Sequence, residues 1–465
     1  MHDAPPPAHS PLPPEPLAHG LKQRHLTMLG LGGVIGAGLF VGSGAGIAVA
    51  GPAIVVSYLI AGTLAMLVMR MLGEMSAAMP ASGSFSVHAE RALGRWAGFG
   101  VGWLYWFLLV VVLAVEATAA AQIAHGWVPC VDPWLWVLVF MVVFTVANLT
   151  AVKNFGEFEF WFAALKVTAI VAFLVLGLLA VLGILPDTDP VGMANLTGQG
   201  GFLPNGWDGV VSGVLTVVFA FGGLEVLTIA AAETDDPARA VGRAVRSAMV
   251  RILFFYVGSM LIIVTVLPWT AQQAGLSPYV KVLDAIGVPS AGQIMNIVVF
   301  VALLSALNAN LYGASRMIFS LAERGEAPRG LLKVSGNGGG GVPRRAVLAS
   351  VAFGFVSVLL NLKWPDTVFL YLLNSVGAVL LFVWGLIAAS QLRLRRRIER
   401  EAPRALTLKM WCFPYLTWLT LAGLLGVLVL MLTDDAARSQ VLWSAGATGL
   451  VLLVAGVREF RARRA

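Results

Sequence analysis

Long apolar segments, separated by short polar stretches, run through nearly the whole chain. The hydrocarbon core of a bilayer is about 30 Å thick, so a helix needs about 20 apolar residues to cross it. The pattern therefore predicts an all-α integral membrane protein with twelve transmembrane helices. The expected spans cover residues 26–50, 52–79, 98–126, 134–152, 158–184, 208–232, 246–270, 290–321, 345–363, 367–390, 412–432 and 439–457.

The first span is unusual because glycines stand where a membrane helix would carry leucines. Eight glycines lie between Gly30 and Gly46, and each interior glycine weakens a helix by roughly 0.5–1 kcal/mol relative to alanine. Backbone groups opened at membrane depth must be buried in protein or line a cavity. The run indicates either a broken helix that forms a binding site or close helix packing through small residues, and taken alone it favours neither.

A second interruption in the sixth span favours the binding site. There the sequence VFAFGGLEVLTIAAAET contains Gly222, Gly223 and Glu225. Interrupted helices in corresponding halves of a transporter point to an inverted repeat with a central site. Free N–H groups after Gly36 suit a carboxylate, and freed carbonyls near Val34, Phe219 and Gly222 suit an ammonium group, so the site suits an amino acid zwitterion. Close packing remains the interpretation of Gly42, Gly44 and Gly46.

Three ionisable residues lie within predicted spans: Glu116, Lys166 and Glu225. Because a charged group at a helix centre costs at least about 2.5–3.5 kcal/mol, these side chains should face the bundle interior. Each is a candidate proton carrier, and the alternative is a buried ion pair or hydrogen bond that holds helices together. Phe219 is expected to cover the pocket, whereas His88 is expected to be a solvated loop histidine.

The basic residues alternate between the two ends of the spans. Of 31 Lys and Arg residues, 27 fall on one side; Lys281, Lys363 and Arg438 fall on the other, and Lys166 lies inside a span. By the positive-inside rule both termini are cytoplasmic. The net charge of +7 therefore reflects topology and lipid-headgroup contacts, and no nucleic-acid partner is expected.

The domain organisation is simple. Residues 1–20 are proline-rich and lack the apolar core of a signal peptide, so they are expected to form a disordered cytoplasmic tail before a single transporter domain over 21–465. No Walker A, DFG or HExxH motif is present, and an enzyme is not expected. Cys130 and Cys412 are predicted near opposite membrane faces, so neither a disulfide nor a metal site is expected.

Several motifs resemble those of bacterial amino acid permeases of the amino acid–polyamine–organocation superfamily. They include GGVIGAGLFVGSG, FAFGGLEVLTIAAAETDDP and NANLYGASRMIFSLAERGEAPRGL, and the combination looks most like 4-aminobutyrate (GABA) permeases. The resemblance implies a LeuT-like fold, with inverted five-helix repeats over about 26–184 and 208–390. Helices 1 and 6 would be broken, and helices 11 and 12, about 412–457, would be peripheral.

The resemblance also implies residue roles. Lys166 matches a lysine that stands where sodium-coupled relatives bind sodium, and it would bind carbonyls of spans one and eight. Gly222 and Gly223 depart from the bulkier residue expected in 4-aminobutyrate permeases, which predicts a roomier pocket. The proton-coupling residues would be Lys166, Glu116 and Glu225. The substrate-binding residues would be Val34, Ile35, Gly36, Ala37, Gly38, Glu116, Phe219, Ala220, Gly222 and Gly223.

The expected function is proton-coupled import of 4-aminobutyrate or a related amino acid across the plasma membrane by alternating access. The alternatives are a proline or aromatic amino acid permease, an obligatory amino acid exchanger, and, in a different class, an amino acid sensor. The expected partners are the amino acid and the lipid bilayer. No metal, no cofactor other than the coupling proton and no obligate protein partner are expected.

Overall fold

The fold is all-helical throughout the residues that the structure, a computed structural model, describes: 23–81, 83–150, 152–185, 193–231, 234, 236–272, 275–334, 342–364, 368–433 and 435–464. The predicted tail over 1–20 lies outside them. The helices are α1 Gln23–Gly32, α2 Ala37–Phe40, α3 Gly42–Ala50, η1 Gly51–Ala53, α4 Ile54–Ala78, α5 Ser84–Leu93, α6 Arg95–Trp127, α7 Pro133–Thr150, α8 Val152–Val181, α9 Ala194–Thr197, α10 Gly206–Val218, η2 Phe219–Phe221, α11 Val226–Ala230, α12 Pro237–Val266, η4 Trp269–Ala271, α13 Pro278–Ala285, α14 Ala291–Glu323, η5 Arg329–Leu332, α15 Arg344–Gly354, α16 Val356–Lys363, α17 Val368–Glu401, η6 Pro403–Ala405, α18 Tyr415–Thr433 and α19 Asp435–Arg464.

Ten helical segments in the described part of the chain are long and apolar enough to cross a membrane. A shorter apolar helix, Pro133–Leu149, lies where the span 134–152 was predicted. The first predicted span is divided among α1, α2 and α3. The prediction of an all-helical, multi-pass membrane protein is thus confirmed, while the count of twelve spans and the inverted repeat remain predictions.

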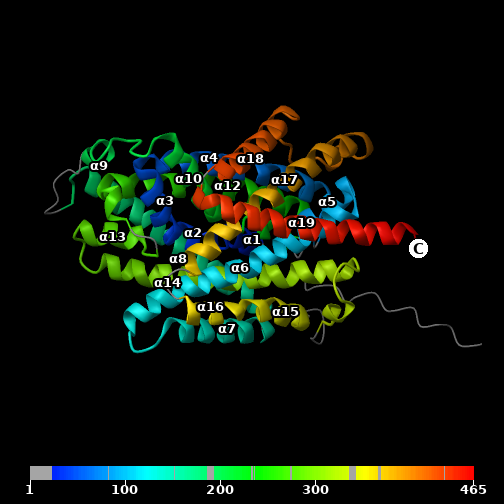
Figure 1. The fold of residues 1–465 in the computed structure, drawn as a ribbon, viewed down its shortest axis with the longest axis horizontal. Helices are drawn as coiled ribbons and strands as arrows, with labels where there is room; N and C mark the ends of the chain where they lie inside the picture. Colours follow the sequence, from blue (N-terminus) through cyan, green and yellow to red (C-terminus); the bar gives the residue numbers. More distant parts are fainter. Residues whose placement is uncertain are drawn as a thin grey trace, which may run out of the picture.

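The long helices run roughly side by side along the long axis of the molecule (Figure 1). Helix α6 is central, because 83% of its most apolar window is buried, whereas α18 and α19 bury only 28% and 22%. An apolar helix left uncovered by protein fits a lipid environment. We call the end with α5 the basic end, because Arg324, just after α14, and Arg393, in the last turns of α17, both contact α5. Helix α13 lies at the opposite end of the molecule (Figure 1), which we call the cavity end because a cavity lined in part by α13 opens there.

Both predicted interruptions are present. Helix α1 ends at Gly32 and α2 begins only at Ala37. Helix α10 gives way to η2, and residues 222–225 separate η2 from α11. Gly223 has φ +97°, a conformation that a residue with a Cβ rarely adopts. The glycines therefore open the helices where the sequence indicated.

One loop expectation is wrong: His88 is fully buried rather than solvated. It belongs to α5, which packs against α6, and its Nε2 lies 3.2 Å from the Ser76 hydroxyl. Burial lowers the pKa of His88 to about 3, and the Arg91 charge acts in the same direction. The imidazole is therefore neutral, and it is a packing residue of this short helix.

Candidate functional site

The two interruptions face each other in the interior. A Cβ atom on Gly38 would lie 2.6 Å from the Ala220 Cα and 3.0 Å from the Phe219 Cδ1. A Cβ atom on Gly223 would lie 3.1 Å from the Gly33 carbonyl oxygen. The 2.6 Å contact is shorter than real Cβ contacts and the other two are tighter than most, so glycine allows the two broken helices to meet closely.

The space beside Gly222 is bounded by its neighbours. A Cβ atom there would lie 3.1 Å from the Leu380 Cδ2 and 3.2 Å from the Phe219 carbonyl oxygen. Gly222 is nevertheless half-buried, and the Leu380 contact is with the end of a flexible side chain. The roomier pocket wall therefore remains a prediction.

The first amide of α2 is bound by an internal carboxylate. The Ala37 N–H lies 3.1 Å from both Oε1 and Oε2 of Glu116, which is 3% exposed and comes from α6. Gly36 makes this approach possible, because a Cβ on it would lie 2.4 Å from the Glu116 Oε1. The Ala37 amide, which was predicted to bind the substrate carboxylate, thus already binds the Glu116 carboxylate.

Lys166 lies on the other side of the same interruption. Its fully buried Nζ donates to the Gly32 carbonyl oxygen, the last of α1, at 2.5 Å. The Lys166 ammonium also interacts electrostatically with the Glu159 and Glu116 carboxylates. In the described part of the chain Gly32 is the carbonyl that accepts from Lys166, so the contact with span eight remains a prediction.

The Val34 carbonyl, one of the three expected to bind an amine, meets a tyrosine that the sequence reasoning missed. The Tyr256 hydroxyl, on α12, lies 3.1 Å from the Val34 carbonyl oxygen and 2.9 Å from that of Ala220. It therefore bridges the two interruptions. A tyrosine hydroxyl inside a span requires a polar partner, and this was the signal available in the sequence.

Glu225 holds the second interruption in place. Its Oε2 accepts from the Gly223 N–H at 3.0 Å and from the Tyr105 hydroxyl at 3.1 Å. Its Oε1 accepts from the Trp384 Nε1 at 2.5 Å. The carboxylate thus ties the opened backbone to α6 and α17, and these contacts favour the structural alternative over proton carriage.

The predicted site residues are buried, except Gly222, which is half-buried. They are Val34, Ile35, Gly36, Ala37, Gly38, Phe219, Ala220, Gly222 and Gly223 in and around the two interruptions, together with Glu116 and Lys166.

Glu159 is a second residue that the sequence reasoning missed. It is fully buried and lies seven positions before Lys166, so the two share a face of α8, roughly 10 Å apart. Its carboxylate accepts from the Ser305 hydroxyl at 2.8 Å and from the Asn308 amide at 2.9 Å. Asn308 in turn accepts from Asn148 at 2.7 Å. The carboxylate is thus bound by neutral donors and is close enough to affect Lys166.

Glu159→Gln is expected to shift the pH dependence of uptake while leaving the protein folded. Glutamine retains a hydrogen-bonding group for Ser305 and Asn308 but removes the negative charge that stabilises the Lys166 ammonium, so uptake should fail at a lower external pH than in the wild type. Initial uptake rates in proteoliposomes across pH 5 to 9 measure this. Ser305→Ala is the control, because it removes one hydrogen bond and keeps the charge. Equal pH profiles for Glu159→Gln and the wild type would show that the Glu159 charge does not stabilise the Lys166 ammonium.

A cavity of about 650 Å³ opens at the cavity end of the bundle. Its lining includes Val41 and Ala119, which lie one helical turn beyond Ala37 and Glu116, and the polar residues Gln122, Lys281 and Asn296. Next to Val41 in the sequence, the Phe40 ring packs edge-on against Tyr279 of α13, with ring centroids 5.0 Å apart. The cavity thus reaches residues about one helical turn from Ala37 and Glu116.

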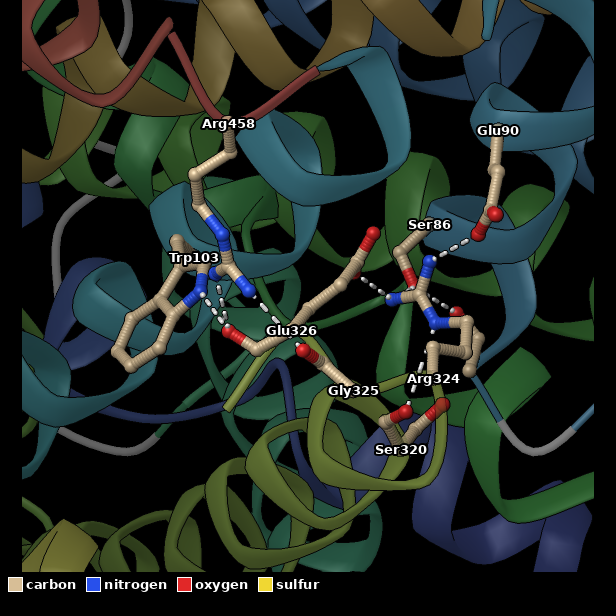
Figure 2. A network of polar contacts seen from close by, with 9 residues as sticks. Ser86, Glu90, Trp103, Ser320, Arg324, Gly325, Glu326 and Arg458 are labelled. Atoms are coloured by element: carbon tan, nitrogen blue, oxygen red, sulfur yellow. Dashed lines mark hydrogen bonds and ion pairs between the residues drawn. The ribbon is translucent and has the colours of Figure 1, made fainter. Parts of the chain in front are cut away.

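A polar network lies at the basic end (Figure 2). Arg324, just after α14, donates to the Glu90 carboxylate at 2.8 Å and to the Ser86 hydroxyl at 3.0 Å, both on α5. It also pairs with Glu326 at 3.2 Å. Arg458 of α19 donates to the carbonyl oxygens of Gly325 and Glu326 at 3.0 and 3.2 Å. The network joins α5, α14 and α19 at one point.

This network predicts a pH-dependent stability. Burial raises the pKa of Glu326 to about 7, against the opposing effect of the Arg324 charge; Glu90 raises it further, and Arg95 and Arg458 lower it. A carboxyl whose folded-state pKa is raised contributes stability below its unfolded pKa and loses it as pH rises through the folded value. The unfolding midpoint should therefore fall as the pH rises from about 5 through 7.

Thermal unfolding of the purified protein at a series of pH values tests this stability. Glu326→Gln should flatten the dependence, whereas Glu401→Gln, at an exposed carboxylate of α17, should not. A wild-type slope in the Glu326→Gln protein would show that Glu326 is not the group responsible.

A family model and several similar proteins all concern amino acid transport. The family model described as amino acid permease matches residues 25–457. The chain is 50% identical to the gamma-aminobutyric acid permease of Bacillus subtilis, covering 93% of this chain and 92% of that protein. It is 44% identical to the gamma-aminobutyric acid permease of Escherichia coli, covering 95% and 93%. It is also 48% identical to an aromatic amino acid transport protein of Corynebacterium glutamicum, covering 95% and 96%.

The fold is similar to that of solved transporters. A crystal structure of an Eremococcus coleocola manganese transporter mutant aligns with a TM-score of 0.58 at 15% identity, covering 93% of this chain and 92% of that one. At this identity the likeness concerns the fold alone. The family match over most of the length and the relatives of 44–50% identity decide the assignment. The chain belongs to the amino acid permease family and transports amino acids.

Proposed function

We propose that this permease is a proton-coupled importer of 4-aminobutyrate or a closely related amino acid. It would lie in the bacterial plasma membrane with both termini cytoplasmic, as a LeuT-like bundle of twelve spans. The observation that carries the proposal is the Glu116 carboxylate on the Ala37 amide. An amide at a helix N-terminus attracts a carboxylate, and an amino acid brings one.

The Glu116 contact gives a physical reason for proton coupling. A substrate carboxylate that binds the Ala37 amide must displace the Glu116 carboxylate or lie against it. Two like charges in a buried site repel each other strongly. A proton on Glu116 removes one of the charges, so proton uptake and substrate binding favour each other.

Lys166 would couple proton uptake to the contact between α1 and α8. Its Nζ holds the Gly32 carbonyl, five residues before Ala37, the first predicted anion-binding amide. A charged lysine binds this carbonyl strongly, whereas a neutral amine binds it weakly. A change in Lys166 protonation therefore changes how firmly α1 is attached to α8, which provides a link between the coupling proton and helix movement.

The substrate amine would bind on the opposite side of the interruptions. The Val34 and Ala220 carbonyls lie together at the Tyr256 hydroxyl. An ammonium group could replace or join this hydroxyl as their donor. Phe219, which is 5% exposed and packs against Gly38, would cover the methylene groups between the two charged ends.

Alternating access would use the two ends of the bundle. The cavity near Lys281 would admit substrate from outside, and the Arg324 network would keep the cytoplasmic side closed. Movement of α1–α2 and α10–α11 past their neighbours would then exchange which end is closed. This requires the contacts of Arg324 and Arg458 to break in the inward-open state.

Substrate identity is the first thing to test. Relatives named as gamma-aminobutyric acid permeases support 4-aminobutyrate, and the 48% identical aromatic amino acid transport protein supports an aromatic substrate as the second candidate. Uptake of labelled 4-aminobutyrate into proteoliposomes, with competition by unlabelled proline, phenylalanine and tyrosine, separates the two. Inhibition only by the aromatic amino acids would favour the second candidate. Uptake that requires internal amino acid would indicate an exchanger.

A further inference from the structure

A second cavity, of about 760 Å³, lies at the basic end. It is formed where the last turns of α17 approach α18 and the junction of α5 and α6. Its lining combines Arg393, Arg396 and Arg400 with Trp96, Trp418 and Leu421. Positive charge and exposed apolar surface thus meet within one hollow.

The arginines of this segment have different surroundings. The run LRLRRRIERE contains five of them. Arg395 is buried and forms ion pairs with Glu74 and Glu399. Arg397 pairs with Glu401 at 2.9 Å. Both acidic residues of the run are therefore already engaged by arginines that do not line the cavity.

The other three arginines share one face of α17. Positions 393, 396 and 400 are spaced three and four residues apart, so they project on the same side of the helix. All three are exposed, and within the described residues none forms an ion pair. Arg393 donates to the Ala92 carbonyl oxygen at 3.3 Å, which directs it toward the end of α5. The cavity therefore carries three uncompensated positive charges.

The rest of the lining is apolar. Trp418 is 58% exposed, and Leu421 lies almost one turn farther into α18. Trp96 is fixed because its Nε1 donates to the Leu93 carbonyl oxygen at 2.9 Å. Tryptophan side chains favour the headgroup level of a bilayer. The arginines thus lie at the polar edge and the leucines and tryptophans lie beside the hydrocarbon.

We propose that this cavity binds an anionic phospholipid, with its phosphodiester against Arg393, Arg396 and Arg400 and its acyl chains along Trp418 and Leu421. Guanidinium groups bind phosphate oxygens in bidentate fashion. A free phosphate would leave the apolar wall uncovered. A zwitterionic lipid would compensate the three charges only in part, because its headgroup carries no net charge.

The bound lipid would connect α17 with α18 and with the junction of α5 and α6. Arg395 fixes α17 to Glu74 of α4, and the neighbouring cavity faces α18 and the α5–α6 junction. Helix α5 also carries Glu90 and Ser86 of the Arg324 network. An anionic lipid in this cavity would brace α5 against α17 and so stabilise the closed basic end.

Native mass spectrometry of the purified full-length protein tests the proposal. The protein is incubated with phosphatidylglycerol, with phosphatidylcholine of the same acyl chains, or with glycerol 3-phosphate, and retained ligand is counted. Near a membrane surface each basic residue contributes about 1 kcal/mol to binding an anionic lipid. We therefore expect retention of phosphatidylglycerol over phosphatidylcholine by at least about tenfold, and no retention of glycerol 3-phosphate.

Two charge-matched variants locate the site. The triple substitution Arg393→Gln, Arg396→Gln and Arg400→Gln should reduce phosphatidylglycerol retention to the phosphatidylcholine level. The triple substitution Arg329→Gln, Arg397→Gln and Arg404→Gln removes the same charge from the same end but leaves the cavity intact, so it should retain the lipid. Equal retention by both variants would overturn the proposal.

The wild-type protein provides a test that does not depend on folding of the variants. Equal retention of phosphatidylglycerol and phosphatidylcholine would show that the charges do not select the lipid. Retention of glycerol 3-phosphate at the same level would show a site for a free anion. Either result overturns the proposal, even if the cavity variant does not fold.

Discussion

Lys166→Ala is expected to abolish uptake driven by a pH gradient while leaving a folded protein that still exchanges bound substrate. The Lys166 Nζ is fully buried and holds the Gly32 carbonyl oxygen at 2.5 Å. Alanine removes both this bond and the positive charge between Glu116 and Glu159. Without a titratable group at this position, proton movement no longer changes the attachment of α1 to α8. Uptake in proteoliposomes, with and without an imposed pH gradient, measures the effect.

Counterflow provides the control for Lys166→Ala. Exchange of labelled for unlabelled substrate at equal pH requires binding and alternation but no net proton movement, so it should persist at a reduced rate. Lys363→Ala is the matched substitution, because Lys363 lies at the end of α16 with its ammonium over the Trp364 ring. If Lys166→Ala still concentrates substrate along the proton gradient, the role assigned to Lys166 is wrong.

Gly38→Ala is expected to weaken substrate binding roughly 5- to 150-fold, because overpacking costs typically about 1–3 kcal/mol and each 1.4 kcal/mol is a factor of ten. The added Cβ would lie 2.6 Å from the Ala220 Cα. Since that neighbour is backbone, no rotamer change relieves the contact, and the two interruptions must move apart. Binding of labelled substrate to purified protein measures the loss.

Gly42→Ala is the control within the same glycine run. A Cβ atom there would meet the Ala37 carbonyl oxygen and Leu373 only at 3.5 Å, an ordinary contact distance. Its binding should stay close to that of the wild type. If the two variants lose affinity equally, the run is a packing surface along its whole length, and the assignment of Gly38 to the site is wrong.

The positions of the two interruptions could be predicted because their cause is local. Glycines within an apolar segment weaken the helix wherever it packs, and the breaks occur at 33–36 and 222–225 as the glycines indicated. Glu116 and Lys166 could be identified for a similar reason, since a charge inside an apolar span requires a special environment whatever its partners are. The pattern of long apolar segments predicted the all-helical membrane fold.

Other parts of the site depend on partners far away in the sequence. Glu159 is bound by Asn308, 149 positions later, and no local sequence pattern indicates this contact. The space beside Gly222 is bounded by Leu380 of α17, a neighbour that the glycines alone could not indicate. His88 was misjudged for the same reason, because the packing of α5 on α6, rather than its polar flanks, decides its burial.

Substrate-coupled proton entry is the direct test of the account. Proteoliposomes that contain the wild-type protein and an internal pH dye are given 4-aminobutyrate outside, with no imposed ion gradient and with the membrane potential clamped. The account predicts acidification of the lumen that begins with substrate addition and is absent in Lys166→Ala vesicles. Uptake of 4-aminobutyrate by the wild-type protein without any acidification would contradict proton coupling.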